Sequence, residues 1–236
     1  MNVGDGIQKG ISGWSFSGDV PDKFVEHIRK SVPLYDMGHD LICSLSDFFC
    51  KSESICYELG TSTGQLIRKL AECNKHKPNI RWIGIDIEEE MIAHAYEHCD
   101  SIDNIGFVCG DVLNFEYEKS DMIVSYYCMQ FIPSNLRQEV FNSIYKSLNS
   151  GGAFLLFEKI KFEDADFQKT VTSIYNNYKL SQGFSLDEIK NKDKSLQGVL
   201  MPLTSKDNLR LLEKAGFLNI KSVMKYLCFE GFLAIK

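Results

Sequence analysis

The stretch that decides the fold is Ile55-Cys56-Tyr57-Glu58-Leu59-Gly60-Thr61-Ser62-Thr63-Gly64. It predicts a short buried strand that ends in a turn, because five mostly apolar residues run directly into two spaced glycines. Glycine allows positive φ and close approach of a ligand to the backbone. Ser62 takes the middle glycine's place in a dinucleotide fingerprint, and no Lys-Ser/Thr follows, so the turn does not resemble a pyrophosphate site. Taken alone, it also fits an ordinary strand-to-helix connection.

Strand and helix patterns alternate along the chain on both sides of this turn. Two helices, separated at Ser31-Val32-Pro33, are expected within 22–49. Further strands are expected at 81–87, 105–109, 121–127 and 153–157, with helices at 65–74, 88–99 and 133–148 between them, and 149–152 as a sharp helix stop. Helical pieces at 167–178, 186–194 and 208–215 follow, and then two closing strands at 220–227 and 228–235. The alternation predicts an α/β fold with a doubly wound, mostly parallel, seven-stranded Rossmann-like sheet.

The domain organisation follows from the same pattern. Residues 1–236 are expected to form a single domain. Within it we expect an N-terminal helical cap at 1–50, a nucleoside-binding core at 51–160, a lid-like helical insertion at 161–203, and a C-terminal helix with two strands at 204–236.

Composition excludes several classes of protein. The net charge of −6 over 236 residues gives no general cationic field, so direct nucleic-acid binding is disfavoured. The longest apolar runs, such as 153–157, are far too short to cross a membrane. The start of the chain lacks the features of a signal peptide, and the eight cysteines contain no C-x-x-C pair. We therefore expect a cytoplasmic protein with reduced thiols that acts on a small molecule.

Carboxylates follow the next two predicted strands. Asp86 lies at the end of the second strand, where a carboxylate accepts hydrogen bonds from both hydroxyls of an adenosine ribose; an N-cap role is equally compatible with that position. Gly110-Asp111-Val112 follows the third strand and puts a carboxylate near an adenine amino group, with Val112 packed on the base. Together with the Gly60–Gly64 turn, these residues predict a site for S-adenosylmethionine (SAM).

The order Glu-x-Gly-x-x-x-Gly, strand-final Asp, Gly-Asp resembles that of class I SAM-dependent methyltransferases. A narrower resemblance, to the carboxy-S-adenosyl-L-methionine (carboxy-SAM) synthase family, extends from about Trp14 to the C-terminus. The motifs that carry it are Trp14-Ser15-Phe16, Ser31-Val32-Pro33-Leu34-Tyr35, Met129-Gln130-Phe131, Gly151-Gly152-Ala153, Glu158-Lys159, Phe162-Glu163-Asp164-Ala165 and Lys214-Ala215-Gly216-Phe217. That family converts SAM and prephenate into carboxy-SAM for the modification of wobble uridines in tRNA, and its members form homodimers.

The resemblance also implies a set of SAM-contacting residues. Carried over position by position, the nucleoside and methionine parts would meet Tyr35, Gly60, Thr61, Ser62, Asp86, Ile87, Asp111 and Val112. Four more residues complete the expected cofactor-binding set: Glu58, Gly64, Met91 and Tyr126.

Two positions depart from the family. Tyr126 stands where the family has an asparagine, and Asp193 stands where it has the arginine that pairs with the extra carboxylate. An aspartate would repel a desolvated carboxylate, although Lys192 or Lys194 is near enough in sequence to substitute. The departures favour methyl transfer from SAM to a small-molecule acceptor. Carboxy-SAM synthesis is the first alternative, and a SAM-binding protein without turnover is the second.

The acceptor side of the site offers fewer signals. Tyr126 and Tyr127 end the fourth strand, where acceptors approach, and are the candidate catalytic residues; packing in the core is an equally good interpretation. His94 and His98 have metal-ligand spacing but no third ligand in view, so no metal is expected. The run 190–194 is expected to be a solvated face, and the aromatic residues of the insertion, Phe162, Phe167, Tyr175, Tyr178 and Phe184, suggest a lid.

Overall fold

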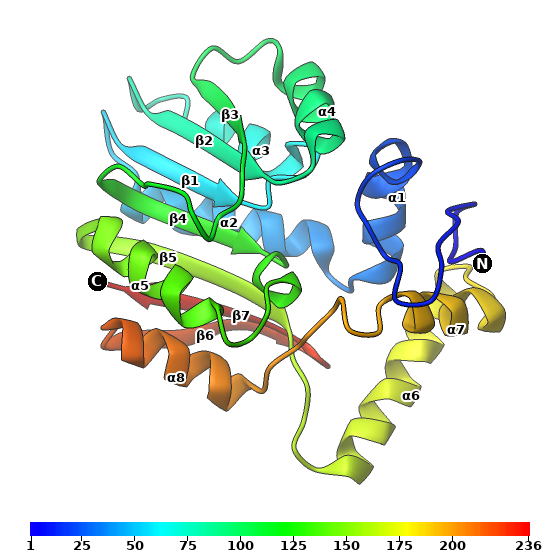
Figure 1. Ribbon diagram of the computed structural model, residues 1–236. Helices are drawn as coiled ribbons and strands as arrows, with labels where there is room; N and C mark the ends of the chain where they lie inside the picture. Colours follow the sequence, from blue (N-terminus) through cyan, green and yellow to red (C-terminus); the bar gives the residue numbers. More distant parts are fainter.

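Seven strands form one sheet in the order β3-β2-β1-β4-β5-β7-β6 in the computed structural model, which describes residues 1–236 (Figure 1). β7 pairs antiparallel with β5 and with β6, and the other pairings are parallel. The predicted fold class, a doubly wound, mostly parallel, seven-stranded sheet, is therefore confirmed. The strands are β1 (Ile55–Leu59), β2 (Arg81–Asp86), β3 (Ile105–Cys109), β4 (Ser120–Tyr126), β5 (Leu148–Lys159), β6 (Asn219–Tyr226) and β7 (Phe229–Ile235).

Helices cover both faces of the sheet because successive strand residues point to opposite sides. Cys56 of β1 packs in one apolar cluster with residues of α2, α3 and α4, whereas its neighbour Tyr57 packs in another with residues of α5 and α8. A continuous buried strand between two helical layers is typical of parallel α/β sheets. The helices are α1 (Val20–Ser31), α2 (Tyr35–Phe49), α3 (Gln65–Cys73), α4 (Glu89–Cys99), α5 (Arg137–Ser147), α6 (Ala165–Ser181), α7 (Leu186–Ser195) and α8 (Ser205–Ala215).

The segment around α5 differs from the sequence prediction in two places. The helix expected at 133–148 begins only at Arg137, after a short 3₁₀ turn at Met129–Phe131. The buried guanidinium of Arg137 donates hydrogen bonds to the carbonyls of Ile132, Gln130 and Met201, which fixes this segment in a non-helical path. The expected helix stop at 149–152 lies inside β5 instead, because β5 begins at Leu148, which pairs with Ser120 of β4.

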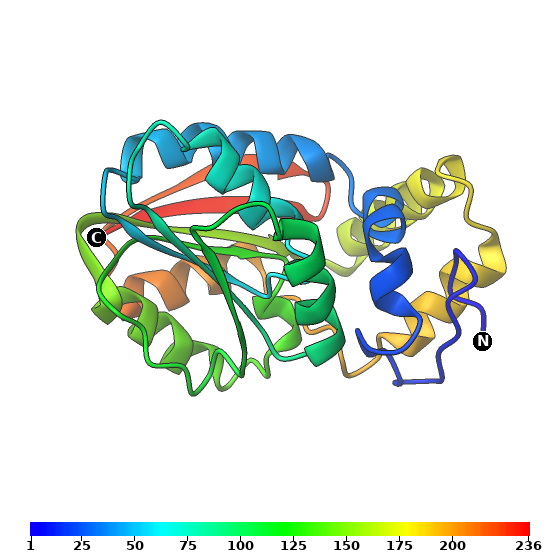
Figure 2. The same ribbon diagram turned by 90° about the horizontal axis from the view of Figure 1, so that it is seen from above.

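The N-terminal segment, α1, α6 and α7 gather beyond one end of the sheet, as Figure 2 shows. The backbone amides of Ser12 and Trp14 donate to the carbonyls of Lys194 and Ser195, so the N-terminal segment adjoins α7 although about 180 residues separate them in sequence. Val3, Ile7 and Trp14 form a separate small apolar cluster there with Val20 and Met91. No helix is long and apolar enough to span a membrane.

Candidate functional site

A cavity of about 390 Å³ lies at the carboxyl ends of the parallel strands. It includes the point between β1 and β4 where the strand order reverses, which is where doubly wound sheets bind ligands. Its other walls come from the N-terminal segment, α1, α6 and α7. Ten of the residues predicted from the sequence line it: Tyr35, Gly60, Ser62, Asp86, Ile87, Met91, Asp111, Val112, Tyr126 and Tyr127.

The turn after β1 depends on Gly60. Its φ is +70°, and a Cβ on Gly60 would lie 2.7 Å from both Cβ and Sγ of Cys128, so a larger residue has no room. Ser62 also has a positive φ, of +52°. The Asp86 carboxylate holds the turn and the next helix together, accepting from the amides of Ser62 at 2.8 Å and Glu88 at 3.1 Å. Burial raises the pKa of Asp86.

Three predicted residues lie outside the main cavity. Glu58 and Thr61 line a smaller cavity of about 30 Å³ that shares Gly60, Ser62 and other lining residues with the larger one. The Thr61 hydroxyl donates to the Glu58 carboxylate at 2.8 Å, and burial raises the pKa of Glu58 to about 8. Gly64 lines neither cavity; it precedes α3, and a Cβ there would lie 3.2 Å from Cβ of Ala95. The structure thus gives Gly64 a packing role.

The remaining nucleoside-side residues follow β2 and β3. Asp111 accepts from the amide of Leu113 at 3.0 Å, which leaves its other carboxylate oxygen without a protein partner. Met91 is buried, and its sulfur accepts a hydrogen bond from the Ser62 hydroxyl at 3.3 Å. Ile87 is 65% exposed although it borders the cavity. An apolar side chain there offers cover for a flat ring.

Tyr126 and Tyr127 are buried aromatic walls of the cavity. The Tyr126 hydroxyl donates to the carbonyl of Tyr35 at 2.7 Å. It reaches that carbonyl because position 38 is glycine: a Cβ on Gly38 would lie 2.1 Å from the Tyr126 hydroxyl oxygen. Burial raises the pKa of both phenols far above the ordinary value, so both stay protonated. They can pack or donate hydrogen bonds, and neither is suited to remove a proton.

Three lysine ammoniums face the other end of the cavity, and we call Lys159, Lys179 and Lys192 the lysine cluster. The Nζ atoms of Lys159 and Lys179 lie 4.7 and 4.5 Å from the ring centroid of Tyr175, and Nζ of Lys192 lies 3.5 Å from that of Trp14. Desolvation lowers the pKa of Lys179 and of Lys192, and the positive charge of Lys159 lowers each further. Such crowded cations favour an anionic ligand.

The run 190–194 was expected to be a solvated face, and this expectation is wrong at Lys192, which lines the cavity and is only partly exposed; Asp193 also borders the cavity but is solvated as expected. The reason is that α7 packs against the N-terminal segment and so directs Lys192 inward. Asp193 remains half exposed and lies 3.6 Å from Nζ of Lys179. Lys194 does not line the cavity. Of the two lysines considered as substitutes for the arginine that the resemblance implies, only Lys192 lines the cavity.

Several residues that line the cavity were not predicted as site residues from the sequence. Trp14, Gln130 and Lys159 lie within motifs that carry the family resemblance, so those motifs held a usable signal. His27, by contrast, sits in an ordinary helical pattern, and nothing in the sequence singled it out. Of the insertion's aromatic residues, only Tyr175 lines the cavity. No group of three or more His, Cys, Asp or Glu side chains is arranged to hold a metal ion.

The chain is similar to known proteins along almost its whole length. Residues 57–152 match the family described as "Methyltransferase domain". The chain is 37% identical to a carboxy-S-adenosyl-L-methionine synthase of Staphylococcus epidermidis, over 94% of this chain and 97% of that protein. It is 34% identical to one of Campylobacter lari, over 94% of each.

Solved structures support the fold. Human N-acetylserotonin methyltransferase in complex with SAM superposes with a TM-score of 0.63 at 17% identity, over 93% of this chain and 56% of that one. A putative SAM-dependent methyltransferase from Methanococcus maripaludis gives 0.63 at 18% identity, over 98% and 97%. At such low identity, this likeness concerns the fold alone.

Proposed function

The chain belongs to the carboxy-S-adenosyl-L-methionine synthase family and is a SAM-dependent transferase, and from this premise we propose that it converts SAM and prephenate into carboxy-SAM. The observation that carries the proposal is the lysine cluster, which faces the same cavity as the predicted nucleoside residues. Prephenate bears two carboxylates. A dianion that leaves water needs paired cations, because an unpaired buried charge is costly.

In the proposal, SAM occupies the half of the cavity at the ends of β1, β2 and β3. The Asp86 carboxylate accepts hydrogen bonds from the ribose hydroxyls, and the free oxygen of Asp111 accepts one from the adenine amino group. Val112 and Ile87 pack on the faces of the base. The methionine part extends past Gly60 toward Tyr126. Its sulfonium then lies among aromatic rings, which attract cations. This arrangement directs the SAM methyl group toward the lysine cluster.

Carboxyl transfer replaces a C–H bond of the SAM methyl group with a C–C bond to a carboxylate. Loss of carbon dioxide from prephenate makes its ring aromatic and expels the ring hydroxyl. The hydroxide and the methyl proton then leave together as water, so atoms and charge balance without a base from the protein. This agrees with the protonated state of Tyr126 and Tyr127. The protein's tasks are to hold the dianion beside the methyl group and to exclude bulk water.

This proposal reverses the order in which the sequence ranked the alternatives. The sequence favoured methyl transfer because Asp193 replaces the family arginine. Asp193 does not act alone, however, since Lys179 lies 3.6 Å away and two further lysines face the cavity. A methyl acceptor without charge gives no reason to gather three lysines at one end of the cavity. The curated relatives likewise favour carboxy-SAM synthesis.

The test is to incubate the purified protein with SAM and prephenate and to analyse the nucleosides by mass spectrometry. We expect a product heavier than SAM by one carbon dioxide, and none when prephenate is omitted. Accumulation of S-adenosylhomocysteine without that product would instead support methyl transfer. Recovery of SAM unchanged would support the alternative without turnover.

A matched pair of variants tests the lysine cluster. Lys179→Met removes a cation of the cluster, and Lys194→Met removes one from α7 that lies outside the cavity. We expect Lys179→Met to raise KM for prephenate at least about tenfold, the loss expected for one charge-assisted hydrogen bond. Lys194→Met should stay within about twofold of the wild type. Equal effects of the two would contradict the assignment.

Two further features come with the family resemblance and form part of the proposal. The product would serve wobble-uridine modification in tRNA, and the protein would form a homodimer. Sedimentation equilibrium tests the second feature directly: a single species with the mass of one chain would remove it. Deletion of the gene, followed by nucleoside analysis of tRNA, tests the first, and unchanged wobble uridines would contradict it.

A further inference from the structure

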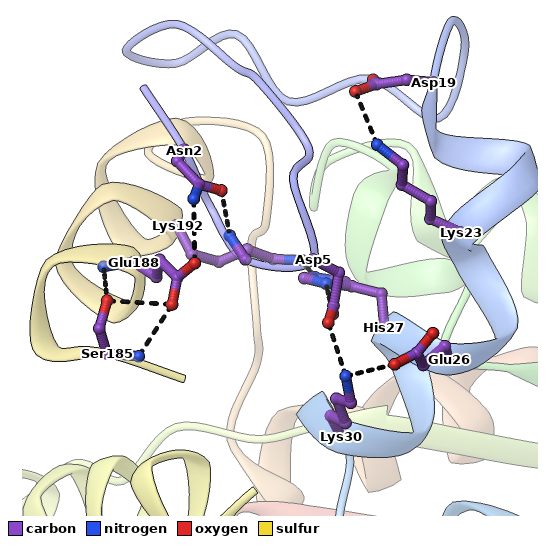
Figure 3. Close-up of polar contacts among 11 residues, drawn as sticks. Asn2, Asp5, Asp19, Lys23, Glu26, His27, Lys30, Ser185, Glu188 and Lys192 are labelled. Atoms are coloured by element: carbon purple, nitrogen blue, oxygen red, sulfur yellow. Dashed lines mark hydrogen bonds and ion pairs between the residues drawn. The ribbon is translucent and has the colours of Figure 1, made fainter. Parts of the chain in front are cut away.

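Three side chains from distant parts of the sequence form a hydrogen-bonded chain beside the cavity (Figure 3). Asp5 belongs to the N-terminal segment, His27 to α1 and Lys192 to α7. The Asp5 carboxylate lies 2.8 Å from Nδ1 of His27, and Nε2 of His27 is in hydrogen-bond contact with Nζ of Lys192. The imidazole therefore bridges an acid on one side and a cavity-facing lysine on the other.

The proton positions follow from the partners. Burial, together with the charge of Lys192, lowers the pKa of His27 to about 4, so the ring is neutral near pH 7. Nδ1 then carries the hydrogen and donates to Asp5, which leaves the Nε2 lone pair to accept from the Lys192 ammonium. Although burial opposes it, hydrogen bonds from Lys30 at 2.6 Å and from His27 lower the pKa of Asp5, which keeps this acceptor charged.

Aromatic rings restrain both the imidazole and the ammonium. His27 stacks on Trp14 with 5.9 Å between centroids and meets the edge of Phe184 at 5.4 Å. Nζ of Lys192 lies over the face of the same Trp14 ring. His27 is only 3% exposed, so its ring has little freedom to turn. One indole thus supports the histidine and the lysine together.

The N-terminal segment is also tied to α7 next to this lysine. The side-chain amide of Asn2 donates to Glu188 at 3.0 Å (Figure 3). The side-chain amide of Asn191 donates to the carbonyl of Asn2, also at 3.0 Å. These bonds join the segment that carries Asp5 to the helix that carries Lys192. The hydrogen-bonded chain of Asp5, His27 and Lys192, which we call the relay, therefore begins and ends on two elements that are also bonded to each other directly.

We propose that His27 is a positioning residue that aims the Lys192 ammonium at a carboxylate of the second substrate. This inference rests on the proposed function. A lysine is a flexible point charge that loses rotamer freedom when it binds, whereas arginine presents a preorganised fork. In the proposed function the carboxylates of the second substrate are bound by the lysine cluster, so the position of each flexible ammonium matters. The relay reduces the freedom of Lys192 before the substrate arrives.

The charges around the relay set how it responds to pH. His27 faces Asp5, Lys30 and Lys192, and Lys30 is paired with Glu26 as well. Lys192 is influenced by Lys179, Lys159, Asp193 and Asp5. Protonation of His27 would remove the acceptor for Lys192 and add a cation beside it. Binding of the second substrate should therefore weaken as the pH falls toward the pKa of His27.

The test uses His27→Phe, which keeps a ring and removes both hydrogen bonds, and His27→Gln, which restores a donor and an acceptor. Carboxy-SAM formation is measured by mass spectrometry while SAM and prephenate are varied separately. We expect His27→Phe to raise KM for prephenate about tenfold, with kcat and KM for SAM changed less than about twofold. His27→Gln should recover most of the loss. A merely structural histidine would affect both substrates or neither, and either result would overturn the proposal.

A double variant and a binding measurement complete the design. If His27 acts through Lys192, adding His27→Phe to Lys192→Met should cause no further loss, whereas additive losses would contradict the relay. Calorimetric titration of prephenate into the protein with S-adenosylhomocysteine needs no turnover. Wild-type protein that binds prephenate but makes no carboxy-SAM would reject the proposed function only. Equal affinity of the wild type and His27→Phe would reject the relay only, and absence of prephenate binding would reject both.

Discussion

The two halves of the cavity are built in different ways. The half that we propose to bind the nucleoside, called the nucleoside half below, comes from the ends of β1, β2 and β3, neighbouring strands whose carboxyl ends must lie together in a parallel sheet. The lysine half comes from β5, α6 and α7, with Trp14 and His27 added from the N-terminal region. The first half follows from sheet topology, whereas the second requires segments to pack beyond the sheet. The residues that line the first half are thus brought together by the order of the strands. Those that line the second half are brought together by tertiary packing.

The largest expected effect is a loss of SAM affinity caused by a substitution in the nucleoside half. Gly60→Ala should weaken SAM binding by more than about 100-fold, because the added Cβ meets Cys128 at 2.7 Å and the backbone has a φ of +70°. Calorimetry with SAM measures it. Gly106→Ala is the control, since a Cβ there meets nothing within 4 Å. Affinity of Gly60→Ala within twofold of the wild type, with an intact fold by circular dichroism, would contradict the account of the turn.

A smaller effect, on the retention of carboxy-SAM, is expected from a substitution in the lysine half. Asp193→Arg restores the family residue and removes the acid that pairs with Lys179 at 3.6 Å. We expect about tenfold tighter retention of carboxy-SAM, because a bidentate guanidinium is added next to the existing cations. Asp193→Asn, which removes the negative charge without adding a fork, should give a smaller gain. Nucleosides released from the purified variants measure this, and an unchanged bound ligand would count against Asp193 as the aligned position.

The packing of Gly38 against the Tyr126 ring should have a smaller effect on SAM binding. Gly38→Ala places a Cβ 2.1 Å from the Tyr126 hydroxyl oxygen, so the ring must shift from its bond to Tyr35. We expect roughly a fivefold rise in KM for SAM. Combining Gly38→Ala with Tyr126→Asn, the family residue, removes the clash and should recover part of the loss. A double variant worse than Gly38→Ala alone would show that the two positions do not interact this way.

The smallest expected effect concerns stability and pH. Burial raises the pKa of Glu158 to about 8, against an ordinary value near 4.5, so the folded state keeps a proton that the unfolded state loses between these pH values. Unfolding free energy should therefore fall as pH rises through this window, by about 1 kcal/mol per pH unit for this group. Urea titrations from pH 6.5 to 8 should show a shallower slope for Glu158→Gln. An identical slope would mean that Glu158 is ionised in the folded protein.

The same division explains what the sequence could predict. Strand ends and their residues Gly60, Asp86 and Asp111 were predictable, because apolar runs ended by glycine or aspartate locate the carboxyl edge of a parallel sheet. The late start of α5 was not, because it depends on the buried Arg137 guanidinium binding the carbonyl of Met201, 64 residues away. The inward direction of Lys192 could not be predicted either, because the charged run 190–194 has the pattern of a solvated face. Only the packing of α7 against the N-terminal segment directs Lys192 into the cavity.

The most direct test of the central claim uses prephenate labelled with carbon-13 in its ring carboxylate. The labelled compound and SAM are incubated with the wild-type protein, and the nucleosides are analysed by mass spectrometry. We predict carboxy-SAM that carries the label, together with phenylpyruvate that lacks it. Unlabelled carboxy-SAM, or S-adenosylhomocysteine as the only nucleoside product, would contradict the assignment of the lysine half as the site of the carboxylate donor.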